Sequence, residues 1–357
     1  KQGVYDENEI EHYRKVLTCC RENGVEPIVT MMHFTSPKWL IENGGWENEA
    51  TVEAFKNYCQ YVTEQLGDLM HYVCTINEAN MGIQVAAISA RYRAQMMAKM
   101  QRMQQGGAEE KKDLEGTAQV GMNFNDMMAN MQKQKEENVE IFGTDTLQTF
   151  VSARTPEGDM LVIRAHQAAR AAMKAVKPEL QIGLTLSLHD IQAQEGGEET
   201  AAKEWVDEFT HYVPYIKEDD FFGLQNYSRS LIGPNGILPV PEGAEITQMD
   251  YEYYPEGLEH VIRRVYEEMP MPIMVTENGI ATADDTRRVA YIQTAMKGVE
   301  NCIQDGIPVK GYMYWSMMDN FEWQKGFGMT FGLISVDRTT QTRTAKPSLT
   351  VLGNYTK

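Results

Sequence analysis

Strand-like and helical stretches alternate along most of this chain, and this alternation constrains its fold more than any other feature. Apolar runs of strand length are followed by stretches with apolar residues at helical spacing. The pattern predicts strands over 27–34, 72–76, 181–188, 221–226, 272–276 and 309–316, and helices over 6–23, 51–66, 160–176, 201–213, 255–268 and 285–305. Strands joined by single helices form right-handed βαβ units, so we expect an α/β fold with a parallel sheet.

Two α/β architectures fit this alternation, a doubly wound sheet and a (β/α)8 TIM barrel. A doubly wound sheet normally carries a glycine-rich phosphate loop after an early strand. The nearest candidate, Gly326-Phe327-Gly328, lacks the third glycine and follows no suitable strand. Several predicted strands end in polar residues, at the end where a barrel keeps its active site. We therefore expect a single barrel domain over residues 1–357.

The predicted barrel is incomplete and carries an insertion. About six strands are recognisable after an initial helix, so a full barrel would lack its first two strands and one helix. About 80 residues separate Glu78 from the next core helix, far more than an ordinary loop. Two methionine-rich groups in this stretch each share one helical face: Met96, Met97, Met100 and Met103, and Phe124, Met127, Met128 and Met131. We expect an inserted helical hairpin over 91–140, whose methionines either pack as ordinary core or cover an open side of the barrel.

Composition narrows the possible partners and the location. No apolar run approaches the roughly 20 residues that cross a bilayer. With 51 acidic against 33 basic side chains, the net charge is -18, so phosphate backbones and anionic lipids repel the chain. We expect no nucleic-acid or membrane partner. Five cysteines, including the adjacent Cys19 and Cys20, make a poor disulfide framework, and no signal-like segment is recognisable, so the expected location is cytoplasmic.

Two glutamates, Glu78 and Glu277, are the strongest candidates for chemistry. Each comes at the end of an otherwise apolar predicted strand. A single glutamate in such a place could be a structural salt-bridge partner, because buried carboxylates are nearly always paired. Two carboxyl groups at one barrel mouth are what glycosidic-bond cleavage requires. One protonates the leaving oxygen, and the other attacks or activates water.

Aromatic residues favour a carbohydrate ligand. Trp315 and Trp323 flank Glu322 just beyond the last predicted strand. An indole stacks on the apolar face of a sugar and a carboxylate accepts from paired hydroxyls, although tryptophans at such positions also occur as core. His33 could likewise be a hydroxyl donor or a core residue.

Other kinds of catalysis find little support in the sequence. His189 and Asp190 could be mistaken for metal ligands, but nothing else has metal-ligand spacing, and there is no Gly-x-Ser-x-Gly elbow. We expect no metal, no cofactor and no serine nucleophile.

At these residues the sequence resembles the family 1 glycoside hydrolases, the β-glucosidases and their relatives. Thr75-Ile76-Asn77-Glu78 is similar to the family's Thr-Phe-Asn-Glu acid/base motif, and residues 275–279 match its nucleophile motif. Residues 315–323 and 331–337 resemble its sugar-binding signature, His33-Phe34-x-x-Pro37 its His-Trp-Asp-Leu-Pro stretch, and Asn226-Tyr227 its Asn-Tyr-Tyr. The motifs occur in the family's order from the first helix to the C-terminus.

The resemblance implies a role for each candidate and a function for the chain. It implies that Glu277 is the nucleophile, Glu78 the acid/base, and Tyr227 a hydrogen-bond donor to the nucleophile. Asn77 would contact the sugar 2-hydroxyl, and Trp315 would be the surface on which the sugar ring stacks. The ligands of the other sugar hydroxyls would be His33, Glu322 and Trp323. Phosphosugar members carry a serine and a basic cluster at the position of Glu322-Trp323. The implied function is hydrolysis of an unphosphorylated β-glucoside or related β-glycoside by retaining double displacement, without a cofactor.

The sequence departs from the family pattern at several points. Ala79 replaces the usual proline and Val73 the usual tryptophan, both packing changes. The family's first two strands would carry a sugar-binding glutamine and an arginine beside the nucleophile. Their absence leaves an alternative open, a non-catalytic carbohydrate-binding or scaffold protein derived from a family 1 glycosidase. It also predicts a homo-oligomer, formed through the methionine-rich insertion or a missing N-terminal piece.

Overall fold

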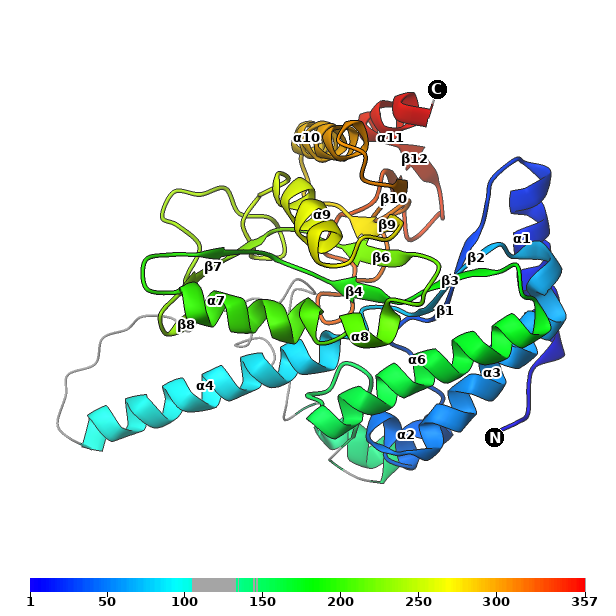
Figure 1. Cartoon of the computed structure of the whole chain (residues 1–357), viewed down its shortest axis with the longest axis horizontal. Helices are drawn as coiled ribbons and strands as arrows, with labels where there is room; N and C mark the ends of the chain where they lie inside the picture. Colours follow the sequence, from blue (N-terminus) through cyan, green and yellow to red (C-terminus); the bar gives the residue numbers. More distant parts are fainter. Residues whose placement is uncertain (105–132, 134, 144, 146, 357) are drawn as a thin grey trace. The chain divides into compact units, whose positions relative to one another are not determined.

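The chain divides into two compact units in a computed structural model, which describes residues 1–104, 133, 135–143, 145 and 147–356 (Figure 1). Unit 1 comprises Lys1–Ala98, Met131–Leu186 and His211–Gly223. Unit 2 comprises Ser187–Thr210 and Leu224–Lys357, together with residues 99–130, most of which lie outside the described part. The unit boundaries fall within helix α4 (Met81–Gln104) and strands β4 (Thr185–Ser187) and β6 (Phe222–Gln225).

Unit 1 is built on a parallel sheet in the order β1-β2-β3. Its strands are β1 (Ile28–Met32), β2 (Tyr72–Ile76) and β3 (Gln181–Gly183), and its helices include α1 (Glu7–Glu22), α2 (Lys38–Glu42), α3 (Ala50–Leu66), α6 (Pro156–Val176) and α8 (Val213–Ile216). Asp6 and Thr155 cap the N-termini of α1 and α6 through their side-chain oxygens. Helices α3 and α6 lie side by side (Figure 1) and pack apolar faces against each other.

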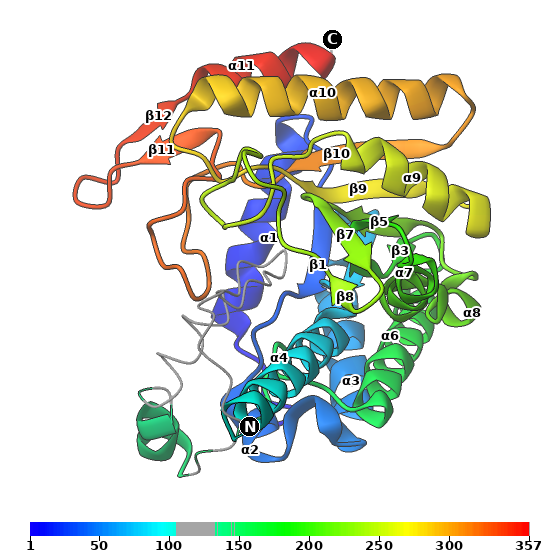
Figure 2. The same ribbon diagram turned by 90° about the vertical axis from the view of Figure 1, so that its left-hand side faces the viewer.

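Unit 2 contains the parallel neighbours β10 and β9, with β6 beside β9. Its elements include β5 (Asp190–Ala193), α7 (Glu198–Trp205), β7 (Arg229–Gly233), β8 (Gly236–Ile237), α9 (Gly257–Glu268), β9 (Ile273–Asn278), α10 (Asp285–Gln304), β10 (Val309–Tyr314), β11 (Ile334–Val336), β12 (Arg343–Ala345) and α11 (Pro347–Gly353). Helix α10 begins at the cap residue Asp284 and packs against both α9 and α11 (Figure 2).

Every strand predicted from the sequence is present, but the stretch 181–188 is two strands rather than one. Strand β3 pairs with β2, whereas β4 belongs to the sheet that contains β6. Between them the backbone N–H of Leu184 donates to the carboxylate of Asp219 at 3.2 Å instead of to a neighbouring strand. Periodicity does not encode such a switch, because both halves are equally apolar and buried.

The single helix predicted over 201–213 is wrong. Helix α7 ends at Trp205 and continues as one π-helical turn over Val206–Thr210. The residue just before this turn and its last residue both donate to one carboxylate on α9. The Trp205 indole donates to Glu268 at 2.7 Å, and the Thr210 hydroxyl donates to it at 3.0 Å. Tertiary hydrogen bonds of this kind stabilise a widened turn that the local pattern does not indicate.

The predicted methionine-rich insertion lies only partly within the described residues. Its first helix belongs to α4, a 24-residue helix that begins at Met81, shortly after β2 and Glu78. Residues 135–142 are helical, and 105–132 are outside the described part. Met97 is exposed. The hairpin and its covering role therefore stay predictions.

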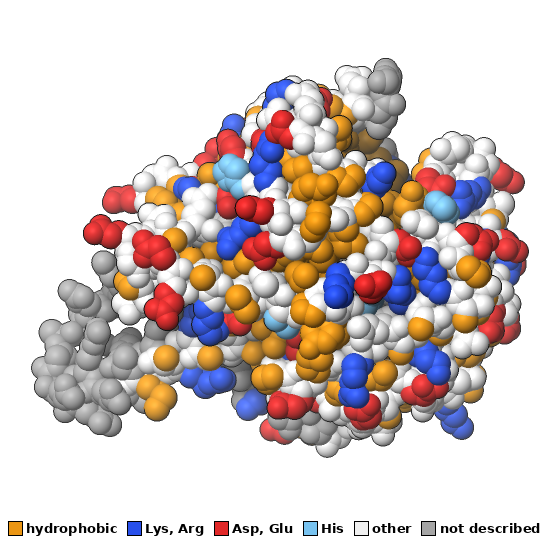
Figure 3. Space-filling view, in the orientation of Figure 1, with side chains coloured by type: hydrophobic (Ala, Val, Ile, Leu, Met, Phe, Trp, Pro, Cys, Tyr) orange, Lys and Arg blue, Asp and Glu red, His pale blue; other side chains and the backbone are white. Residues whose placement is uncertain are grey.

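Charged side chains of both signs are scattered over the visible surface, among hydrophobic and other side chains (Figure 3). On the face in Figure 3, Lys and Arg side chains are interspersed with Asp and Glu. Among the helices of the described residues, none has the length and apolar character that crossing a membrane requires.

Candidate active site

Strand β9 of unit 2 carries Glu277 into a buried position. The sequence predicted that the strand ends at Thr276, but it continues through Glu277 to Asn278. The neighbouring chain after β6 fixes this end, because the backbone N–H of Asn226 donates to the carbonyl of Glu277 at 3.2 Å. The Glu277 side chain is therefore held by a regular element rather than by a loop, which favours a precise site.

Tyr227 is the hydrogen-bond partner of Glu277. Its hydroxyl donates to Oε2 of Glu277 at 2.6 Å. The tyrosine ring is buried in an apolar cluster with Met249, Tyr251, Ala281 and Phe331, so its orientation is fixed by packing. A short bond from a fixed donor orients the carboxyl group and stabilises its charged form.

The Glu277 carboxyl group is electrostatically linked to Glu322. Burial and, to a smaller extent, the nearby Glu322 raise the pKa of Glu277 to about 8, although the Tyr227 hydrogen bond acts to lower it. Burial likewise raises the pKa of Glu322 to about 7, against a hydrogen bond from the Trp315 side chain that lowers it. The structure thus brings together Glu277, Tyr227, Glu322 and Trp315, all candidates from the sequence.

A tight loop after β10 presents Glu322 and Trp323. The backbone groups of Glu322 and Gly326 exchange two hydrogen bonds of 2.7 Å, and Gly326 has a φ of +67°. The start of this loop lies against β9, where the Trp315 N–H donates to the carbonyl of Asn278 at 2.9 Å. Glu322 is buried and Trp323 half-buried.

Two tyrosines that the sequence did not single out connect the end of β9 to the chain after β6 and to β10. Asn278 Nδ2 donates to the carbonyl of Asn226 at 2.6 Å and to the hydroxyl of Tyr291 at 3.0 Å. The Tyr291 hydroxyl donates to the carbonyl of Tyr227 at 2.9 Å, and the Tyr312 hydroxyl donates to Oδ1 of Asn278 at 2.8 Å. The only sequence signal was the presence of polar hydroxyls in apolar stretches of α10 and β10.

Unit 1 holds Glu78, Asn77 and His33. Glu78 follows β2 with 2% of its surface exposed, and Asn77 is almost as deeply buried. The Asn77 N–H donates to the carbonyl of Met32 at 2.8 Å, which links the end of β2 to the end of β1. Burial lowers the pKa of His33 to about 4, so its imidazole is neutral at pH 7. A neutral imidazole can both donate to and accept from a sugar hydroxyl.

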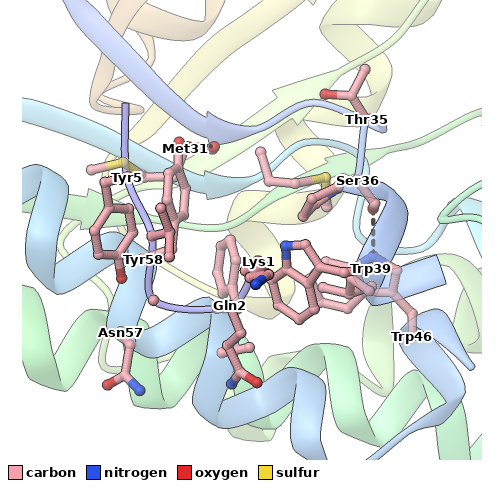
Figure 4. Close-up of a pocket in the computed structure, with 17 residues that line it drawn as sticks. Lys1, Gln2, Tyr5, Met31, Thr35, Ser36, Trp39, Trp46, Asn57 and Tyr58 are labelled. Carbon is pink, nitrogen blue, oxygen red and sulfur yellow. Dashed lines mark hydrogen bonds between the residues drawn. The ribbon is translucent and has the colours of Figure 1, made fainter. Parts of the chain in front are cut away.

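Unit 1 also contains a pocket of about 540 Å³ (Figure 4). Residues near the end of β1, from α3 and from the segment 1–5 line it, and its walls are mainly apolar. The Trp46 indole donates to the Ser36 hydroxyl at 3.2 Å beside Trp39. His33, Asn77 and Glu78 are not among its described lining residues.

His189 and Asp190 pair with protein groups. His189 Nδ1 is 2.8 Å from Glu208, and Asp190 is 2.8 Å from His260. Within the described residues, no three or more His, Cys, Asp or Glu side chains cluster in a way that could hold a metal ion.

Comparison with known proteins gives consistent matches. The model of glycosyl hydrolase family 1 matches residues 1–105 and 239–355. A solved β-glycosidase, BGL167, is 40% identical, with a TM-score of 0.81 over 99% of this chain and 78% of its own. A β-glucosidase solved in its apo form is 34% identical, with a TM-score of 0.83 over 99% and 80% of the two chains. The β-glucosidase of an Agrobacterium species is 26% identical over 97% of this chain and 75% of its own.

Proposed function

Because the chain belongs to glycosyl hydrolase family 1, and is therefore a glycoside hydrolase with the family's (β/α)8 barrel fold, we propose that it hydrolyses an unphosphorylated β-glucoside or a closely related β-glycoside with retention of configuration. The observation that carries this proposal is the buried Glu277 carboxyl group with its 2.6 Å hydrogen bond from Tyr227. A carboxyl group so oriented suits a nucleophile.

In the first step, a Glu277 oxygen attacks the anomeric carbon while the Glu78 carboxylic acid protonates the glycosidic oxygen. The bond between the anomeric carbon and this oxygen breaks, the aglycone alcohol leaves, and a covalent glycosyl-enzyme forms. The Tyr227 hydroxyl supports this step because it holds the carboxyl group in one orientation.

In the second step, the roles of Glu78 and its proton reverse. Glu78, now a carboxylate, takes a proton from water as the water oxygen attacks the anomeric carbon from the opposite face. The ester bond to Glu277 breaks and the free sugar leaves with its original configuration. No metal or cofactor is needed in this sequence of steps.

Glu322 and the two tryptophans, Trp315 and Trp323, support the proposed sugar class. A buried carboxyl group accepts hydrogen bonds from sugar hydroxyls once ionised, and an indole offers a face for the apolar side of the ring. A phosphate at this position would meet a like charge, and the cation in the same loop, Lys325, is paired with Asp250 at 3.1 Å. The relatives do include the 6-phospho-β-galactosidase of Lacticaseibacillus casei, at 25% identity.

Release of phenols from aryl β-glucosides tests the proposal. Glu277→Gln should abolish turnover, because an amide is no nucleophile, whereas Glu78→Gln should lower kcat/KM, which reports the first step, by about 100-fold or more for poor leaving groups and much less for activated ones. Glu300→Gln, at a half-buried glutamate of α10 that pairs with Lys297, is the control and should leave rates unchanged.

The same assay includes a 6-phospho-β-glucoside, which should be the poorer substrate. If no substrate is cleaved above the Glu277→Gln background while sugar still binds, the chain is the non-catalytic carbohydrate-binding protein instead.

A further inference from the structure

Glu78 has a backbone conformation that an L-residue rarely adopts. Its φ is +44°, in the left-handed region, although it is not glycine. Such conformations persist only where the surrounding structure determines them, and they cluster at functional sites. The neighbouring residues that impose this conformation therefore influence where the Glu78 carboxyl group points.

Thr185 on β4 bonds to the chain on both sides of Glu78. The Glu78 N–H donates to the Thr185 hydroxyl at 3.0 Å, and this hydroxyl donates to the carbonyl of Ile76 at 3.2 Å. The next N–H, that of Ala79, donates to the backbone carbonyl of Thr185 at 3.0 Å. Thr185 thus fixes the peptide groups before and after Glu78.

The Thr185 side chain has little freedom to move. It is 1% exposed, and a Cβ atom built on Gly223 would lie 2.4 Å from its methyl group. The glycine therefore makes room for the methyl group on one side, and the hydroxyl faces Glu78 on the other. A hydroxyl in this setting is a fixed acceptor rather than a rotating one.

Arg154 fixes the next peptide group along the chain, the one that contains the carbonyl of Ala79. Its Nη1 donates to the carbonyl of Ala79 at 3.0 Å, and its own N–H donates to the carbonyl of Gly82 at 3.1 Å. A Cβ atom on Gly82 would lie 2.5 Å from Arg154 Nε, so glycine is required for this approach. Arg154 also donates to the carbonyl of Phe150 at 3.1 Å.

The buried charge of Arg154 is balanced within unit 1. Asp159 lies 3.5 Å from Nη1, and both side chains are almost fully buried. Asp159 is held in turn by the Tyr212 hydroxyl at 2.9 Å and by His211 Nε2 at 3.0 Å. A buried ion pair with this many hydrogen bonds has one arrangement, so the guanidinium is a rigid anchor.

We propose that Thr185 and Arg154 are positioning residues that clamp the backbone around Glu78 and so aim its carboxyl group at the glycosidic oxygen. This inference rests on the proposed role of Glu78 as acid/base. It assigns part of the proton-transfer efficiency to two residues that do not touch the substrate. Proton transfer depends steeply on alignment, so a small rotation of Glu78 reduces the rate without removing the acid.

Thr185→Val tests the clamp because it keeps the shape of threonine and removes the acceptor for the Glu78 N–H. We expect kcat/KM for an unactivated phenyl β-glucoside to fall about 10- to 100-fold. For a 2,4-dinitrophenyl β-glucoside, whose leaving group needs no proton, kcat/KM should change less than about 3-fold. A retained rate on this substrate also shows that the active site of the variant is correctly folded. Thr185→Ser retains the hydroxyl and should restore the phenyl rate.

Thr63→Val is the matched control, since Thr63 is a buried threonine of unit 1 whose hydroxyl donates to a carbonyl within α3. It should affect both substrates equally. For the second residue of the clamp, Arg154→Lys keeps the charge beside Asp159 and should show the same leaving-group dependence as Thr185→Val.

Equal effects of Thr185→Val on the two substrates, or failure of Thr185→Ser to restore the phenyl rate, would overturn the clamp. Glu78→Gln, measured in parallel, separates this failure from that of the proposed function. If Glu78→Gln shows leaving-group dependence and Thr185→Val behaves like Thr63→Val, only the clamp is wrong. If Glu78→Gln shows none, the acid/base role and the clamp fall together.

Discussion

Glu277 is a nucleophile candidate whose environment favours the neutral acid. Burial and Glu322 raise the pKa of its carboxyl group to about 8, and the Tyr227 hydrogen bond only partly opposes them. Near pH 7 a large share of the molecules therefore carries a proton on this group. Attack on the anomeric carbon requires the anion, so the population of active enzyme should grow as pH rises through this range.

Covalent labelling of Glu277 tests this pH dependence directly. A 2,4-dinitrophenyl 2-deoxy-2-fluoro-β-glucoside has a leaving group that needs no proton, so its inactivation rate reports the nucleophile alone. We expect the rate to rise with pH, with a midpoint near the pKa of about 8. Glu322→Gln should move the midpoint to lower pH, and Tyr227→Phe should move it higher. A rate that is flat from pH 5 to 9 would contradict this electrostatic description.

The same raised pKa predicts that Glu277 destabilises the folded protein at high pH. Between the ordinary value of 4.5 and about 8, the unfolded chain loses this proton while the folded chain keeps it. The contribution of Glu277 to the free energy of unfolding therefore falls as pH rises through this window. Relative to wild type, Glu277→Gln should be more stable by on the order of a few kcal/mol at pH 9 and about equal below pH 4.5.

Urea unfolding of both proteins at the two pH values measures this difference. Glu300→Gln, at a half-buried glutamate of α10, should show no such pH-dependent gain. A stability difference between Glu277→Gln and wild type that does not change with pH would mean that Glu277 ionises normally in the folded state.

Sequence motifs located the groups that can do chemistry but not those that hold them. Glu277 and Tyr227 are 50 residues apart in the chain, and the structure joins them by a hydrogen bond. Tyr291, Thr185 and Arg154 could not be singled out in this way. They bond to backbone carbonyls and amides of distant residues. Because nearly every residue type offers these backbone groups, the sequence does not indicate which residue is the partner.

At the scale of elements, the contact between β9 and the loop after β10 depends on Gly279. A Cβ atom at this position would lie 2.1 Å from the carbonyl oxygen of Trp315. Neither backbone can yield easily, because the Trp315 N–H is bonded to Asn278 at 2.9 Å. The distance between Glu277 and the loop that bears Glu322 is therefore set by a residue without a side chain.

Gly279→Ala should separate these two elements and impair the site. We expect kcat/KM for aryl β-glucosides to fall at least about 10-fold, with a lower melting temperature, since overpacking typically costs about 1–3 kcal/mol. Gly311→Ala is the matched control in β10, because a Cβ atom there would make only ordinary contacts, the nearest at 3.6 Å. Equal activities of the two variants would show that the Gly279 contact does not position the loop.

Apolar runs predicted the strands because most are buried and all are short, and this is most evident for β2, which runs over the predicted residues 72–76. The failures occurred where tertiary bonds override the local pattern. Asp219 interrupts the stretch 181–188, and Glu268 widens the turn after α7. Both carboxylates lie on other segments of the chain, so periodicity within one window could not indicate them.

On the scale of the whole molecule, the evidence for glycosidase function is distributed over both compact units. Unit 1 carries Glu78 with its backbone clamp, and unit 2 carries Glu277, Tyr227 and Glu322. Family membership follows from matches that extend over nearly the entire chain, including 99% coverage by a relative that is 40% identical. The order of motifs along the sequence predicted this family because each motif depends on chemistry rather than on packing.

The central claim is that Glu277 forms a covalent glycosyl-enzyme while Glu78 transfers the proton, and the stereochemistry of hydrolysis tests it most directly. Proton NMR of an aryl β-glucoside reaction, recorded before the sugar mutarotates, identifies the first anomer released. Two displacements at one carbon restore its configuration, so the β-anomer should appear first and the α-anomer only later, by mutarotation. Initial release of the α-anomer would mean a single displacement by water and would contradict the account.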